Sequence, residues 1–179
     1  MTTLIMLRHP TPLGGAGLCY GRLDLPCAPE AAEEIAVACA SAPKACSILS
    51  SPASRALSLA RALAARDGLA VEVDARLQEL DFGAWEGRRW SEIDRRESDP
   101  WATDPMNRAP PGGESFAALR ARVSDALDEL AERTLIVTHA GPIRAARMRA
   151  EGISFEAAFA EPVAHAVPIR LDWSACVGG

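Results

Sequence analysis

The sequence predicts an α/β fold of three layers, in which a mostly parallel central sheet is covered by helices on both faces. Short apolar runs alternate with longer helix-like segments along the chain, which is typical of repeated βαβ units. Two of the runs, residues 4–7 and 135–137, are continuously apolar, as strands buried on both faces are. Crossovers in such sheets are right-handed, and ligands bind beyond the carboxyl ends of the strands.

The first expected strand covers about residues 3–8 and leads into a loop at residues 14–26 that contains several glycines. A helix is expected over residues 29–42, because proline suits the first helical turn and three early glutamates complement the positive end of the helix dipole. This pair of elements opens the alternating pattern.

A second short strand is expected at residues 47–50. The next two residues, Ser51 and Pro52, resemble an N-cap followed by a first-turn proline, so we expect a helix from Ser51 to about Arg66. A third, weaker strand is predicted at residues 71–73.

Between Arg76 and Gly113 the regular pattern fades. A stretch of this kind inside a compact domain is typical of a functional lid or insertion rather than a linker. Tryptophans alternate here with turn-forming residues: Trp85, Trp90 and Trp101 with Gly83, Gly87, Pro100, Pro105, Pro110 and Pro111.

The last part of the chain returns to alternation. Apolar residues at spacings of three and four predict a long helix over residues 114–133, and a strand then ends at Thr138. A further helix is expected to open with Gly141 and Pro142. Residues 166–171 predict a final strand, placed at a sheet edge because the proline within it cannot donate a ladder hydrogen bond.

Length and charge indicate the class of protein. The 179 residues are enough for one domain with a continuous core, spanning residues 1–179, and the formal net charge of −5 argues against a nucleic-acid-binding surface. Neither a secretory signal nor an apolar run long enough to cross a bilayer is recognisable, so we expect a cytoplasmic protein without a membrane partner. The five cysteines form no Cys-x-x-Cys pair and are expected to be reduced thiols.

Two of the three histidines, His9 and His139, directly follow the two most apolar strands. Arg8 precedes the first of them, and Arg55 falls near the start of a helix, from which its side chain can lean back toward the strand ends. Two arginines and two histidines would then converge at one edge of the sheet. Guanidinium groups present a rigid fork of donors that matches phosphate oxygens, so this grouping predicts a site for an oxyanion.

Five segments follow one another along the chain: Leu-x-Arg-His at the amino terminus, Ser50–Ala56, Leu77–Gly87, Pro111–Ser115 and Val137–Gly141. In this order they resemble the signature of the histidine phosphatase superfamily, the phosphoglycerate-mutase-like proteins, over residues 4 to about 145. A further segment, Cys19–Pro26, is similar to the α-ribazole phosphatase-like branch associated with cobalamin synthesis.

The resemblance implies a role for each matching residue. His9 would be the nucleophile that becomes phosphorylated, Arg8 and Arg55 would hold the phosphoryl oxygens, and His139 would donate a further hydrogen bond to the transition state. Glu79 matches the family's proton donor to the leaving alcohol. An attacking imidazole must be unprotonated, whereas the donor must stay protonated until the leaving oxygen departs.

Other residues depart from the family pattern or remain open. Pro10 replaces the glycine that usually follows the nucleophile and removes a backbone N–H, and Ala140 replaces the glycine after His139. Arg22 is a candidate for substrate binding, although a solvent-exposed loop arginine is the alternative interpretation. His165 is expected to have a structural role.

The function predicted from these residues is a metal-independent phosphatase for a small phosphomonoester, with α-ribazole phosphate as a candidate substrate and with no cofactor. Alternatives within the family are a phosphoglycerate-type mutase and a protein-phosphohistidine phosphatase. A noncatalytic phosphate-binding protein is the alternative from another class. A zinc site that uses His9, His139 and a cysteine is opposed by the ligand spacing and by the adjacent arginines. The sequence leaves the oligomeric state open, with a homodimer as one possibility.

Overall fold

A central sheet of five strands forms the middle layer of the structure, a computed structural model that describes residues 2–131 and 133–173. The strand order is β3-β2-β4-β1-β5, so β4 lies at the centre and β3 and β5 at the edges. The first four strands pair in parallel, and β5 runs antiparallel to β1. The strands are β1 (Thr2–Arg8), β2 (Ser47–Ser50), β3 (Val71–Val73), β4 (Thr134–Thr138) and β5 (Ile169–Trp173).

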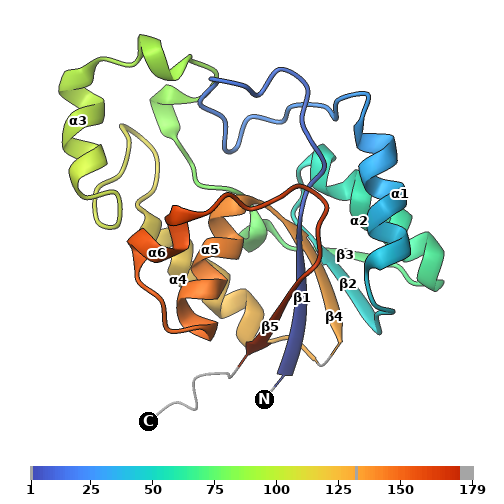
Figure 1. Ribbon diagram of the computed structural model, residues 1–179. Coiled ribbons are helices and arrows are strands. Elements are labelled where there is room, and N and C mark those ends of the chain that lie inside the picture. The colour runs from blue at the N-terminus through green and yellow to red at the C-terminus, as the bar shows by residue number, and fades with distance from the viewer. Residues whose placement is uncertain (1, 132, 174–179) are drawn as a thin grey trace.

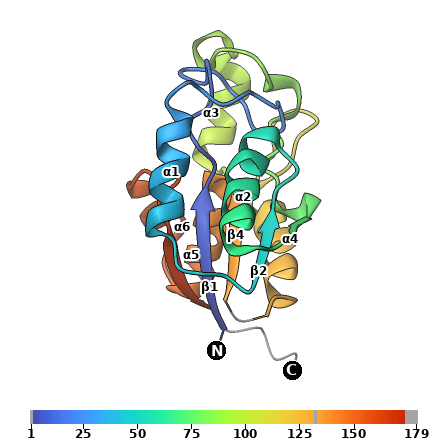
Figure 2. The ribbon, with the colours of Figure 1, turned by 90° about the vertical axis from the view of Figure 1, so that its right-hand side faces the viewer.

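Helices cover both faces of this sheet (Figures 1 and 2). Alternate residues of β1 point to opposite faces: Ile5 and Leu7 belong to the apolar cluster with α1 and α2, whereas Leu4 and Met6 belong to the cluster with α4 and α5. The predicted three-layer α/β architecture is therefore confirmed. The helices are α1 (Ala31–Ser41), α2 (Ser54–Asp67), α3 (Arg95–Thr103), α4 (Phe116–Asp128), α5 (Ala140–Ala150) and α6 (Phe155–Ala160).

The predicted N-cap of α2 is wrong. The helix begins at Ser54 with Ala53 as its N-cap, and the hydroxyl of Ser51 lies 2.8 Å from Nε2 of His139. The N-terminal end of the helix is instead capped by a loop residue: the Asp24 carboxylate accepts the backbone N–H of Ser54 at 3.0 Å. Arg55 still lies in the first turn, as expected.

The segment predicted to be irregular contains one α-helix and short turns of 3-10 helix. Helix α3 was missed because its interior proline, Pro100, argues against a helix. The Asp94 side chain caps its start by accepting the N–H of Arg96 at 2.9 Å. Its Trp101 packs at 5.5 Å from Trp85, centroid to centroid, so tertiary packing outweighs the propensity.

Several other element boundaries differ from the prediction. Helix α4 ends at Asp128 rather than near residue 133, and helix α6 was not expected at all. The last strand lies at an edge as predicted, but it begins at Ile169, because Ala166 just before it has a left-handed φ of 55°.

Helix α2 depends on apolar burial against the sheet, so replacing Leu63, which is 0% exposed, is expected to be costly. The Leu63→Ala variant should lose about 2–5 kcal/mol of unfolding free energy, because it removes buried methyl groups and leaves a cavity. Urea titration followed by circular dichroism measures the loss. Arg61→Ala, at an exposed position of the same helix, is the control, and equal effects of the two changes would contradict this account.

Candidate active site

Two histidines meet where the central strands end. β1 and β4 are neighbouring parallel strands, so His9 and His139, which follow them, lie side by side with ring centroids 5.0 Å apart. They are 2% and 1% exposed and line a cleft of about 300 Å³ together with Arg8, Arg55 and Glu79. The structure therefore brings together five of the six residues predicted for the site.

His9 is held in one tautomer. Its Nδ1 lies 2.7 Å from the carbonyl oxygen of Pro10, which can only accept, so Nδ1 carries the proton and Nε2 keeps its lone pair. Burial lowers the pKa of His9 well below its usual 6.5; the Pro10 carbonyl acts in the opposite direction, and the charges of Arg55 and Arg8 add to the lowering. The ring is thus neutral near pH 7, with one nitrogen ready to act as a nucleophile.

The chain just before the last strand fixes the backbone around His9. Arg8 donates from Nη1 to the carbonyl of Val163 at 2.8 Å, and the N–H of Ala166 donates to the carbonyl of Arg8 at 2.9 Å. The third histidine, His165, donates from Nδ1 to the carbonyl of His9 at 2.8 Å. His165 therefore supports the backbone of His9, which agrees with the structural role expected for it.

Arg55 is the most deeply buried cation of the site, at 1% exposure. Its guanidinium donates to the carbonyls of Leu23 at 2.9 Å and Gly21 at 2.8 Å, and to Nδ1 of His139 at 3.3 Å. Within the described residues, Nε of Arg55 and Nε of Arg8 are buried donors with no partner. Unsatisfied buried donors are costly, so these two N–H groups are suited to an oxyanion that enters the cleft.

His139 already uses both of its nitrogens. Because Arg55 can only donate, Nδ1 of His139 accepts, and Nε2 carries the proton and donates to Ser51 at 2.8 Å. Burial lowers the pKa of His139 well below 6.5, and the neighbouring His9 and Arg55 add to this. A hydrogen bond from His139 to a phosphoryl oxygen therefore requires one of these contacts to be exchanged.

Glu79 lies against the start of α5. Both of its carboxylate oxygens are 3.1 Å from the N–H of Gly141, and Oε1 also accepts the N–H of Leu80 at 2.9 Å. A Cβ atom on Gly141 would stand 2.1 Å from Oε1. A side chain at position 141 would therefore displace the Glu79 carboxylate, whereas Ala140, the departure seen in the sequence, is accommodated in the core.

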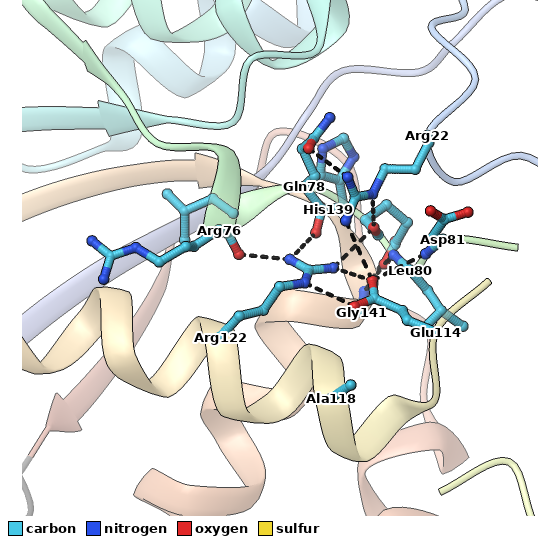
Figure 3. A network of polar contacts seen from close by, with 12 residues as sticks. Arg22, Arg76, Gln78, Leu80, Asp81, Glu114, Ala118, Arg122, His139 and Gly141 are labelled. Carbon is cyan, nitrogen blue, oxygen red and sulfur yellow. Dashed lines mark hydrogen bonds and ion pairs between the residues drawn. The ribbon is translucent and has the colours of Figure 1, made fainter. Parts of the chain in front are cut away.

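A charged pair holds the segment that carries Glu79 (Figure 3). Arg122 of α4 donates to the carbonyls of Arg76 at 2.6 Å, Gln78 at 2.8 Å and Glu79 at 3.1 Å, and it pairs with Glu114 through Nε and Nη2. Burial alone would raise the pKa of Glu114, but the hydrogen bonds and charge of Arg122 reverse this, so its pKa is lowered. The sequence analysis missed Arg122, although its position three residues after Leu119, on the apolar side of α4, was a signal.

Arg22 reaches the same segment from the other side. Its Nε donates to the carbonyl of Glu79 at 3.1 Å, and Nη1 donates to the Gln78 side chain at 2.6 Å. Arg22 lines a neighbouring cavity of about 120 Å³ with His139 and Glu79 rather than the cleft that contains His9. These contacts make Arg22 a support for Glu79, and its binding of substrate stays a proposal.

Loop residues complete the cleft. The Glu86 carboxylate accepts the backbone N–H groups of Gly21, Arg22 and Leu23, which fixes the loop above Arg55. Trp90 lines the cleft, whereas Trp85 is fully buried beneath it. The sequence analysis did not single out Arg144, which also lines the cleft and projects from α5.

Within residues 2–131 and 133–173, no group of three or more histidine, cysteine or acidic side chains could hold a metal ion. In the same ranges, no helix has both the length and the apolar character needed to cross a bilayer. Cys19, Cys27, Cys39 and Cys46 are free thiols, as predicted, and Cys176 lies outside the described residues.

This arrangement can bind and attack a phosphoryl group. One cleft is lined by a neutral imidazole with a free lone pair, by two arginines with unused donors and by the Glu79 carboxyl group. Such a set combines a nucleophile, charge neutralisation and a candidate proton donor.

Comparison with known families agrees with this chemistry. The profile described as histidine phosphatase superfamily (branch 1) matches residues 4–176. The chain belongs to this superfamily, which confirms the resemblance drawn from the five sequence segments.

Particular relatives show the range of the family. A bifunctional protein of Mycobacterium tuberculosis is 37% identical over 105 residues, covering 54% of this chain and 29% of the relative. A putative phosphoserine phosphatase 2 of Hydrogenobacter thermophilus is 31% identical over 116 residues, covering 61% of this chain and 57% of the relative. The matched region thus spans less than a third of the first relative and little more than half of the second.

Solved structures match over nearly the whole chain. A protein from Thermus thermophilus has 29% identity and a TM-score of 0.77, covering 96% of this chain and 94% of that one. The mycobacterial glucosyl-3-phosphoglycerate phosphatase has 25% identity and a TM-score of 0.81, with coverages of 96% and 90%.

The neutral buried histidines make stability depend on pH. Histidine in the unfolded chain has a pKa of about 6.5, so below that pH the unfolded chain binds protons that His9 and His139 do not bind in the folded state. The contribution of these two residues to the free energy of unfolding is therefore fully present above pH 6.5 and decreases as the pH falls. The unfolding free energy should drop by about 1.4 kcal/mol per pH unit for each buried histidine below pH 6.5.

Urea titrations between pH 7.5 and 5 measure this slope above the range where carboxylates titrate. The His139→Gln variant should show a slope smaller by about 1.4 kcal/mol per pH unit. A flat or rising stability as the pH falls would contradict the neutral state of these histidines.

Proposed function

We propose that this protein is a metal-independent phosphatase that hydrolyses a small phosphomonoester through a phosphohistidine on His9. The observation that carries the proposal is the free Nε2 of His9, fixed by the Pro10 carbonyl, in a cleft that Arg8 and Arg55 also line, each with a buried Nε that has no partner. No other described side chain combines a free nucleophilic nitrogen with two such cations in one cleft.

In the first step, Nε2 of His9 attacks phosphorus while the bond to the leaving alcohol oxygen breaks. Arg8 and Arg55 neutralise charge on the phosphoryl oxygens, and Glu79 supplies the proton that the alcohol needs. The proton belongs on Oε2 of Glu79, since Oε1 already accepts from Leu80 as well as Gly141. In the second step, Glu79 takes a proton from water, which attacks the phosphohistidine and releases inorganic phosphate.

His139 acts in this scheme by holding Arg55 and by donating to phosphate after it releases Ser51. Several phosphomonoesters are candidate substrates. The Cys19–Pro26 segment favours α-ribazole phosphate, whereas one relative bears the name of a phosphoserine phosphatase and one structural neighbour that of a glucosyl-3-phosphoglycerate phosphatase. We further propose that this protein is cytoplasmic and acts without a nucleic acid or membrane partner.

A noncatalytic phosphate-binding protein is the second candidate, because Pro10 and Ala140 alter the usual motifs. The presence of Glu79 and His9 in one cleft argues against it, since a binding protein needs neither a proton donor nor a nucleophile. A mutase is the third candidate and would transfer phosphate to a second substrate rather than release it.

A labelling experiment tests the nucleophile. With radiolabelled phosphomonoester and a rapid alkaline quench, the wild type should yield a phosphoprotein that survives alkali and is lost in acid, as phosphohistidine is. The His9→Ala variant should yield none and should lose roughly 10³-fold or more in kcat. His139→Gln is the control and should still be labelled, only more slowly. Labelling of His9→Ala, or its full activity, would remove His9 from the mechanism.

The fit between Gly141 and Glu79 gives a second test. A methyl group in Gly141→Ala should push the carboxylate away and lower kcat by roughly 100-fold, which is within the range lost when a general acid is removed. Glu79→Asp shortens the side chain and makes room, so adding Gly141→Ala to it should cost little more. Steady-state kinetics of the two single variants and the double variant measure this coupling, and strictly additive losses would contradict the assigned contact.

A further inference from the structure

A second cavity, of about 230 Å³, adjoins the catalytic cleft. The two share Leu80, Phe82, Phe116 and Phe159 as lining residues, so the second is an extension of the first. The other residues that line it are also apolar. They are Trp101, Ala102, Pro105 and Phe155.

The walls of this apolar extension are aromatic rings. On one side Phe155 and Phe159 of α6 stack with centroids 4.2 Å apart, and Phe116 meets their edges at 5.2 and 5.4 Å. On the other side are Trp101 of α3 and Phe82, at 6.2 Å from each other. Figure 1 shows α3 and α6 on the same side of the sheet, with α3 above α6, and rings from both line the cavity.

Arg144 fixes the wall at the junction between the two cavities. Its guanidinium lies 4.4 Å from the centroid of the Phe159 ring, and its Nε donates to the carbonyl of Ala158 at 3.2 Å. Arg144 also lines the catalytic cleft, so one side chain ties α5, which carries the active-site residue Gly141, to the aromatic wall of α6. The wall is therefore built before any ligand enters.

We infer that the apolar extension binds the alcohol part of the substrate, and that this part is a planar aromatic ring system joined to the phosphate through an alkyl carbon. The inference rests on the proposed phosphatase function. An apolar cavity on the order of 150 Å³ can hold benzene, so this one has room for a ring system of that size or larger. Rings packed against the edges and faces of other rings gain more than their area alone gives.

A hydroxylated or carboxylated alcohol, by contrast, would find no hydrogen-bonding side chain in the extension other than the indole of Trp101. The catalytic cleft itself is cationic and holds the phosphoryl group. The substrate class that matches both parts is an arylalkyl phosphomonoester rather than a small polar one such as phosphoserine.

Binding of phosphonates tests the inference without turnover. Ethyl phosphonate and 2-phenylethyl phosphonate carry the same anion and cannot be hydrolysed, so calorimetry compares the apolar part alone. The aryl compound should bind roughly 10- to 100-fold more tightly, with a more negative heat-capacity change, because it buries a ring. Equal affinities would overturn the inference.

Two variants on α3 locate the ring. Ala102 lines the extension although the residue is itself exposed, so Ala102→Phe places a ring at the mouth of the extension and should reduce the ratio of aryl to ethyl affinity at least tenfold. Thr103→Phe adds the same ring at an exposed neighbour that lines neither cavity, and it should keep the wild-type ratio. A ratio that is unchanged in Ala102→Phe, or lost equally in both variants, would overturn the location.

Kinetics with ethyl, 2-phenylethyl and 2-cyclohexylethyl phosphates complete the test, since their leaving alcohols have similar acidity. The kcat/KM should rank aryl above cyclohexyl above ethyl, and a cyclohexyl value equal to the aryl value would refute the preference for a planar ring. No turnover of any ester together with aryl-selective phosphonate binding would reject the phosphatase function and keep the site. Turnover of all three esters at one rate would keep the phosphatase function and reject the site for an aromatic ring.

Discussion

The burial of one guanidinium organises the site. Arg55 is 1% exposed, and a buried cation is tolerated only when its donors are used and its charge is balanced. Two loop carbonyls and a ring nitrogen of His139 use most of its donors, but the carboxylate of Asp24, 3.5 Å away, is its one ion-pair partner among the described residues and is half exposed. The loop, the second histidine and the strand ends are arranged around a charge that is left partly uncompensated. A phosphoryl dianion in the cleft, as the proposed function requires, would supply the missing charge.

The same constraint explains why α2 begins where it does. A helix that started at Ser51 would turn its hydroxyl to the helix N–H groups and away from His139, which it contacts at 2.8 Å. Asp24 caps the helix instead, from a loop whose position depends on Arg55. Capping, the histidine tautomer and the buried cation are parts of one arrangement, and changing one of them requires the others to adjust.

Much of the fold and the centre of the site could be predicted, because their signals are local or periodic. The apolar runs predicted strands, and the parallel sheet then required residues after neighbouring strands, such as His9 and His139, to meet. Helix α3 could not be predicted, since Pro100 conceals it and Trp101 packing supplies its stability. Contacts made by Arg122 and Arg144 were also out of reach, because each depends on segments that only the folded chain brings together.

The support of His9 by the segment before the last strand has a consequence for how the protein acquires its activity during folding. His165 donates to the carbonyl of His9 across 156 positions of the chain, and β1 pairs with β5 over a similar separation. Contacts of such long range form late, because the entropy of closing the loop is lost before they stabilise anything. A partly folded chain with a formed first strand would therefore still lack the contact that fixes the backbone of His9, the proposed nucleophile. On that proposal, reactivity at His9 depends on the pairing of the two ends of the chain.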